Sequence, residues 1–164
     1  MREHNQLQMI DVSSKRATPR RAVACGTIWL GPIAYPQVRD RTLPKGDALA
    51  LAETAGIQAS KRCSDWIPLC HPLALDGARV DCELNDTNAS LTIYAQVAAH
   101  AKTGVEMEAL TAVQAALITI WDLAKQVEAN LIIGNTRLLL KEGGKQGCWL
   151  NPDGVPEWIK NEHD

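Results

Sequence analysis

The sequence has no phenylalanine, and aromatic residues make up only 4% of its 164 residues. Alanine is abundant, so the core is expected to consist of small side chains that let helices pack closely on a sheet or on each other. No stretch reaches the ~20 apolar residues of a membrane-spanning helix. The longest candidate, residues 109–124, is interrupted by polar side chains. These absences predict a soluble globular domain of ordinary size that does not bind membranes.

A basic excess is also missing, because the formal net charge is −2. That balance argues against a general nucleic-acid binder or membrane-surface binder. The N-terminus has no apolar run, so no signal peptide is expected. The five cysteines are odd in number and form no Cys-x-x-Cys pattern, which fits reduced thiols in a cytoplasmic protein. Cys70 next to His71 is a poor zinc pattern, so no metal site is predicted.

Residue patterns predict secondary structure in the order β-α-β-β-α-β. Strands are predicted over residues 22–30, 79–84, 91–98 and 131–140, the last interrupted at Gly134-Asn135. Helices are predicted over residues 45–63 and 105–127, the second with apolar residues at helical spacing. This order is typical of the ferredoxin-like α+β fold, an antiparallel sheet with two helices on one face.

The remaining segments are predicted to be irregular. Prolines favour loops over residues 31–42 and 64–72. Residues 1–10 are predicted to be a flexible arm, residues 11–149 a single domain, and residues 150–164 a polar tail.

The helix predicted over residues 105–127 carries acidic residues at both ends. Thr103-Gly104-Val105-Glu106 matches a capping box, so Glu106 is either a cap or a site residue. Glu108 and Asp122 share one helical stripe, on which Lys125 is one turn from Asp122. That pair is either an exposed ion pair or a functional one. Glu108 and Asp122 are about 21 Å apart along a helix, so we expect two subunits to bring opposite helix ends together.

Basic residues cluster near glycines in three places. Lys45 and Lys102 each precede a predicted helix start, where free amide groups could bind an anion. Lys141 and Lys145 flank a glycine pair, which is a weak phosphate signal. Each lysine could equally be solvated. His71, between Cys70 and Pro72, could be structural or could exchange protons, whereas Cys70 is a less favoured nucleophile.

Three long segments resemble a known family. They are residues 67–73 (Ile-Pro-Leu-Cys-His-Pro-Leu), 102–111 (Lys-Thr-Gly-Val-Glu-Met-Glu-Ala-Leu-Thr) and 9–15 (Met-Ile-Asp-Val-Ser-Ser-Lys). They closely resemble cyclic pyranopterin monophosphate synthases, the molybdenum cofactor biosynthesis protein C family. Shorter matches at residues 45–47, 55–57, 122–125 and 141–145 occur in the same order, so the resemblance covers roughly residues 9–148.

The resemblance implies a lyase that converts 3′,8-cyclo-7,8-dihydroguanosine 5′-triphosphate into cyclic pyranopterin monophosphate and diphosphate. It implies a homohexamer, a trimer of dimers with active sites between subunits. It implies no required cofactor, although Mg²⁺ could accompany the triphosphate. Asp122 matches the catalytic aspartate, and Lys45 and Lys125 match essential lysines. The substrate-binding candidates are Leu69, Cys70, His71, Met107, Glu108, Glu106, Lys15, Arg20, Lys141 and Lys145.

Four positions depart from the family pattern. Trp121 replaces the common tyrosine, Cys63 a threonine, and Glu142 and Gln146 serines. None removes a matched catalytic residue, so activity is expected to survive. Two other functions remain open: a nucleotide-sensing module without catalysis, and a purine-processing hydrolase that uses Cys70-His71 with a metal.

Overall fold

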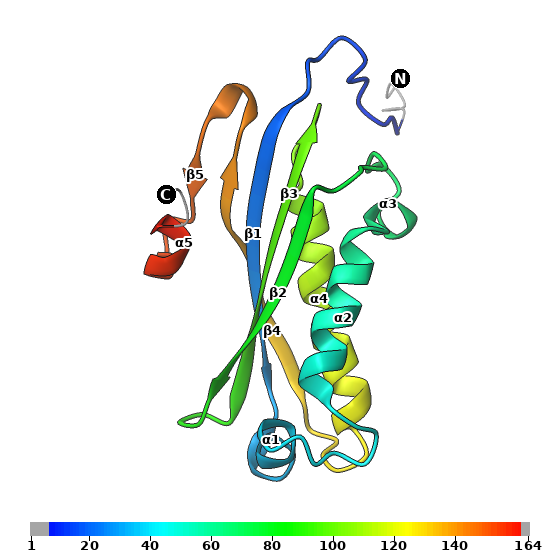
Figure 1. Cartoon of the computed structure of the whole chain (residues 1–164). Coiled ribbons are helices and arrows are strands. Elements are labelled where there is room, and N and C mark those ends of the chain that lie inside the picture. Colours follow the sequence, from blue (N-terminus) through cyan, green and yellow to red (C-terminus); the bar gives the residue numbers. More distant parts are fainter. Residues whose placement is uncertain (1–6, 162–164) are drawn as a thin grey trace, which may run out of the picture.

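The computed structural model describes residues 7–161 and has an α+β architecture (Figure 1). Its elements, in chain order, are β1 (Thr18–Trp29), α1 (Gly31–Arg39), α2 (Ala48–Ser60), α3 (Cys63–Trp66), β2 (Gly77–Asn85), β3 (Ser90–Ala101), α4 (Glu106–Ala124), β4 (Ile132–Glu142), a 3₁₀ turn (Gly144–Gln146), β5 (Trp149–Leu150) and α5 (Glu157–Asn161). Residues 1–6 of the predicted arm and the last three residues of the tail lie outside the described residues.

The strands form one antiparallel sheet in the order β2-β3-β1-β4-β5. The first four strands have the order of the ferredoxin-like split unit, which confirms the predicted fold. The central pair is long: β1 and β3 stay in register from Thr18 opposite Ala101 to Trp29 opposite Ser90. The sheet is therefore a rigid base for the segments that leave its ends.

Helices α2 and α4 cover one face of this sheet (Figure 1). Their close approach depends on small residues. A Cβ at Gly56 of α2 would lie 3.0 Å from the carbonyl oxygen of Ala112 in α4 and 2.9 Å from the side chain of Val80. The close packing predicted from the composition is thus confirmed. Although α4 is long and apolar enough to cross a membrane, most of it is buried in this core, so it is a core helix.

One prediction for the helices was wrong, and one of the two alternatives left open for Glu106 is excluded. Residues 31–39 form α1 rather than a loop, because Pro32 occupies the first turn, where a missing N–H costs nothing, and Ala34, Tyr35 and Val38 are buried. The capping box does not form: α4 begins at Glu106 with Val105 as its N-cap, and no side chain caps it. Glu106 is therefore in the first turn and its carboxylate is free for other contacts.

The interruption predicted at Gly134-Asn135 is a bulge within β4, which continues to Glu142. Asn135 has a φ of 54°, and the pairing of β1 with β4 shifts register between Cys25 and Thr27. Because β4 continues, Lys141 is held in the sheet beside Ala22 of β1. The bulge therefore preserves the strand that carries a predicted substrate-binding lysine.

The C-terminal tail packs on the sheet face opposite α2 and α4 (Figure 1). Ile159 of α5 is fully buried against Val23 and Cys25 of β1 and Leu139 and Leu140 of β4. Asn151 fastens the tail by donating from its side chain to the carbonyl oxygen of Leu138 at 2.8 Å. The polar composition of residues 150–164 thus conceals one apolar anchor.

Candidate active site

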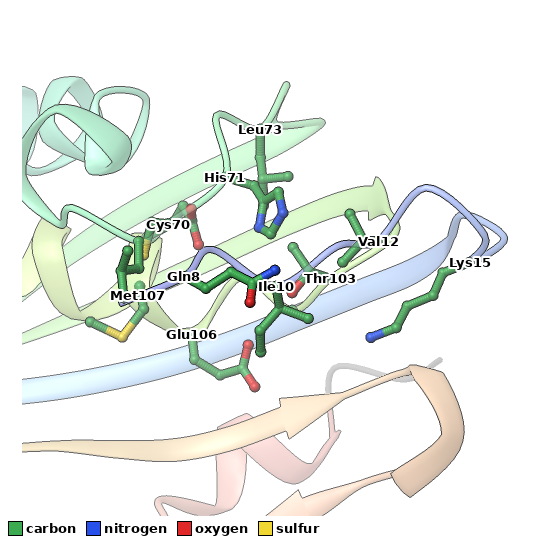
Figure 2. Close-up of a pocket in the computed structure, with 13 residues that line it drawn as sticks. Gln8, Ile10, Val12, Lys15, Cys70, His71, Leu73, Thr103, Glu106 and Met107 are labelled. Atoms are coloured by element: carbon green, nitrogen blue, oxygen red, sulfur yellow. The ribbon is translucent and has the colours of Figure 1, made fainter. Parts of the chain in front are cut away.

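A cavity of about 420 Å³ lies where the loop after α3 meets the first turn of α4 (Figure 2). We call it the His71 cavity. It contains the predicted residues Leu69, Cys70, His71, Glu106, Met107, Glu108 and Lys15. The N-terminal segment closes one side with Gln8, Ile10 and Val12, and Lys102 holds that segment by donating to the carbonyl oxygen of Ser13 at 3.0 Å. Lys102 is therefore engaged with the backbone and is not a free anion ligand.

Glu108 is the buried carboxylate of the His71 cavity. It is only 4% exposed, and burial raises its pKa, a shift that its own backbone N–H and the thiol of Cys63 partly oppose. Cys63 also accepts a hydrogen bond from the hydroxyl of Thr111 at 3.4 Å. A buried carboxylate with a raised pKa is suited to binding polar groups of a ligand and to exchanging protons with it.

A second and larger cavity, of about 800 Å³, adjoins the first. We call it the Lys141 cavity. It gathers cations from three segments of the chain, namely Lys15, Arg16, Arg20, Lys141 and Lys145. The Gly143-Gly144 pair lets Arg20 pack here, since a Cβ on either glycine would clash with Pro19 or Arg20. Within the described residues, Nε of Arg20 and Oγ1 of Thr18 are buried without a hydrogen-bond partner, which suits an anionic ligand.

Glu106, Lys15 and Gly104 line both cavities, so the two form one continuous site. Glu106 lies 3.7 Å from Nζ of Lys141, and Gln146 accepts from the same nitrogen at 3.4 Å. A side chain at position 104 would collide with Glu106. The combined site thus has a neutral-to-acidic half around His71 and Glu108, and a cationic half around Lys141.

The predicted catalytic residues meet at the other end of α4. Nζ of Lys45 lies 2.8 Å from one carboxylate oxygen of Asp122, and Nζ of Lys125 lies 2.7 Å from the other. These two lysines lower the pKa of Asp122 to about 2, Lys125 contributing more than Lys45. All three side chains are about one third to one half exposed. The structure therefore brings the predicted trio together, as an accessible cluster.

The anion site predicted beside Lys45, at the start of α2, does not form. Asp47 is the N-cap of α2, and its carboxylate accepts from the amides of Leu49 and Ala50 at 3.0 and 3.2 Å. Those amides are consequently unavailable to a ligand. Lys45 instead reaches across to Asp122, where it also donates to the backbone carbonyl oxygen at 3.1 Å.

The structure brings the predicted residues together in two groups, which the length of α4 separates. Glu108 and Asp122 are fourteen positions apart on this one helix, or about 21 Å. The sequence-based reasoning missed three contributions: the Cys63–Thr111 contact, the unpartnered Thr18 and the wall formed by Gln8 and Ile10. The departure at Cys63 and the match at residues 9–15 were the signals that could have found two of them.

The sequence matches the MoaC family over residues 9–144. It is 44% identical to the cyclic pyranopterin monophosphate synthase of Heliobacterium modesticaldum, over 92% of this chain and 95% of that protein. It is 47% identical to the molybdenum cofactor biosynthesis bifunctional protein of Synechococcus elongatus, over 91% of this chain.

The chain belongs to the MoaC family. It spans about half the length of the bifunctional protein, 47%, and nearly all of the monofunctional one, 95%. MoaC membership confirms the resemblance found in the sequence. The matched residues 9–144 include every predicted site residue except Lys145, and they end before β5 and α5.

Proposed function

We propose that this chain is a cyclic pyranopterin monophosphate synthase, a lyase of molybdenum cofactor biosynthesis. The observation that carries the proposal is the continuous site, in which a cationic cavity adjoins one with a histidine and a buried carboxylate. A nucleotide-derived triphosphate has this division, with an anionic tail and a polar ring system. The substrate is 3′,8-cyclo-7,8-dihydroguanosine 5′-triphosphate.

The triphosphate occupies the Lys141 cavity in this proposal. Closing the cyclic phosphate requires a sugar-derived hydroxyl to attack the α-phosphorus, which breaks the bond to the bridging oxygen and releases diphosphate. Negative charge grows on that oxygen, and Arg20, Lys141 and Lys145 are placed to neutralise it. Mg²⁺ could arrive with the triphosphate and share this task.

The ring system occupies the His71 cavity. Opening the guanine-derived ring and rebuilding it as a pterin moves protons at carbon–nitrogen bonds. Glu108, with its raised pKa, and His71 are the cavity's candidates for hydrogen bonds to the ring and for proton exchange with it. Met107 and Leu69 offer apolar contact to the ring faces.

Asp122 needs a change in its surroundings before it can act as a base. A carboxylate whose pKa is about 2 holds no affinity for protons near neutrality. Phosphate groups that draw Lys45 and Lys125 away would raise that pKa and make Asp122 basic when substrate is bound. In this proposal Lys45 and Lys125 therefore bind substrate and also switch on Asp122.

Both ends of α4 can serve one reaction if they belong to different subunits. We propose a homohexamer, a trimer of dimers, in which the Lys45–Asp122–Lys125 cluster of one chain completes the His71 and Lys141 cavities of another. The exposed side chains of Leu69 and Met107, which line the His71 cavity, favour such a contact. We further propose that the protein works in the cytoplasm without membrane or nucleic-acid partners.

Incubation with the cyclic GTP-derived substrate tests this function. We expect equal amounts of diphosphate and cyclic pyranopterin monophosphate, measured by coupled phosphate assay and chromatography. Binding without diphosphate release would favour the nucleotide-sensing module. Turnover of other purines that is lost when metals are chelated, with no pterin formed, would favour the hydrolase.

A further inference from the structure

The end of β4 contains one residue more than the part of β1 that it pairs with. Leu140 lies opposite Val23, and Leu138 lies opposite Ala24. Between these two pairs, Leu139 has no partner residue on β1 within the described chain, so it forms a β-bulge. Leu139 and Leu140 consequently point to the same face of the sheet, where each is only 1% exposed.

This bulge decides which way Lys141 points. Lys141 lies opposite Ala22, whose side chain belongs to the core between the sheet and α4. Opposed residues of an antiparallel pair share a face, so Lys141 points to the side of α4, where its Nζ lies 3.7 Å from Glu106. Without the extra residue, regular pairing would put Lys141 opposite Arg21, facing away from the Lys141 cavity. Glu142 would then take its place and exchange a cation for an anion.

Asn151, the residue after β5, is bonded to the bulge. Its Nδ2 donates to the carbonyl oxygen of Leu138 at 2.8 Å, and its backbone N–H donates to that of Leu139 at 2.9 Å. Its Oδ1 accepts from the amide of Asp153 at 2.9 Å, and its carbonyl oxygen accepts from Gly154 at 3.1 Å. A bulge disrupts the hydrogen-bond ladder, so carbonyl groups there need other donors. Asn151 supplies two of them from a fixed orientation.

The short helix α5 covers the two leucines of the bulge. Ile159 is fully buried against Leu139 and Leu140, and the ring of the neighbouring Trp158 meets Tyr94 edge-on at 5.4 Å. A slip to regular pairing would turn Leu140 to the opposite face and away from Ile159, which would cost buried apolar contact. The tail therefore stabilises the bulged pairing relative to the regular one.

We propose that Asn151 is a positioning residue for Lys141. By holding the bulge at Leu139, it keeps Lys141 on the cavity side of the sheet, although the tail itself packs on the other side. The inference rests on the proposed function, since Lys141 contributes to turnover only if the Lys141 cavity takes the triphosphate. It also extends the functional part of the chain past residue 144, where the family match ends.

The register of β4 can be measured in the substrate-free protein by NMR. Asn151→Asp keeps the shape of the side chain but cannot donate to Leu138, and it places a carboxylate against that carbonyl. The cross-strand nuclear Overhauser effect between Lys141 and Ala22 should weaken, and one between Lys141 and Arg21 should grow. Asn151→Ala removes the donor without adding charge, and it should shift the register in the same direction.

A double-mutant cycle on diphosphate release tests whether Asn151 acts through Lys141. Asn151→Asp should lower kcat/KM by about tenfold. The loss should appear mainly in KM, because substrate must first select the bulged pairing. In the Lys141→Met background the same change should cost less than about threefold, because the side chain that it displaces is absent.

Asn85→Asp is the matched control, because Asn85 in the β2–β3 turn accepts from the amides of Thr87 and Asn88 through Oδ1, which aspartate retains. It should leave the register and KM unchanged. An unchanged register in both Asn151 variants would overturn the inference, and so would a shifted register without a rise in KM. A full tenfold loss in the Lys141→Met background would also overturn it. A register shift in a chain whose wild type releases no diphosphate would support the structural role of Asn151 and reject the proposed function instead.

Discussion

The two ends of α4 carry carboxylates whose surroundings act on them in opposite directions. Glu108, in the first turn, is buried and has no cation partner among residues 7–161, and burial raises its pKa. Asp122, in the last turn, is half exposed between two lysines that lower its pKa to about 2. The two acids share a helix, a sheet and a core, so the difference comes from their immediate neighbours.

This difference separates their roles. A pair of acids whose environments push their pKa values apart is the arrangement by which enzymes divide acid and base tasks. Glu108 is suited to gaining and losing protons within the His71 cavity, whereas Asp122 stays ionised until the lysines move. Substituting Glu108 or Asp122 separately tests whether the two acids have different roles.

The largest effect is expected at the Asp122 end. Asp122→Asn removes the charge that organises Lys45 and Lys125, so diphosphate release should fall by about 10²- to 10⁴-fold. The melting temperature should change little, since exposed ion pairs stabilise weakly. Asp86→Asn is the control, because Asp86 is an exposed acid paired with Arg39 away from both ends. Full activity in Asp122→Asn would remove Asp122 from the mechanism.

A smaller effect is expected at the Glu108 end. Glu108→Gln keeps the size but loses the charge and the exchangeable proton. Turnover should fall about 10- to 100-fold, since a hydrogen bond to a charged group contributes about 1.5–3 kcal/mol. The pH profile of kcat/KM, which reports ionisations of the substrate-free protein, should lose one limb. Asp122→Asn should leave that limb in place. An unchanged profile would assign that limb to another group.

The smallest effect is on the pH dependence of stability, where the two ends differ in sign. Asp122 has a lowered pKa, so its stabilisation is present above its ordinary value of 3.8 and is lost as the pH falls toward about 2. Glu108 has a raised pKa, so stability declines as the pH rises above its ordinary value of 4.5.

Urea unfolding at several pH values measures how the free energy of unfolding changes with pH. Asp122→Asn should make that free energy vary less with pH in the acid range. Glu108→Gln should make the protein more stable than wild type near neutrality. Parallel curves for both variants would mean that the two environments do not differ as the structure indicates.

Most of the fold was predictable because its determinants are local and periodic. Helical spacing located α4, alternation located the strands, and their order specified the sheet. Lys45, Asp122 and Lys125, which meet at the last turn of α4, could be identified from the sequence as functional candidates. The ion pair between Asp122 and Lys125 follows from their spacing alone.

Other features depend on contacts that no local pattern encodes. Proline at positions 32 and 36 favoured a loop, but burial of Tyr35 and Val38 stabilises α1. Thr103 and Glu106 have capping-box spacing, yet the helix starts too late for that box to form. In the sequence, Ile159 is an isolated apolar residue of a polar tail. In the folded chain it packs with Val23 and Leu140 of the sheet. The Cys63–Thr111 hydrogen bond joins α3 to α4, so only the folded chain reveals it.

The central claim is that one active site uses the opposite α4 ends of two chains, and subunit mixing tests it most directly. Glu108→Gln and Asp122→Asn, each nearly inactive alone, would be co-expressed at equal levels with different tags and purified as mixed assemblies. If each site takes one end from each of two chains, about a quarter of sites regain both native ends, and diphosphate release should recover to about that fraction of wild type. Mixed assemblies no more active than the better single variant would contradict the shared site.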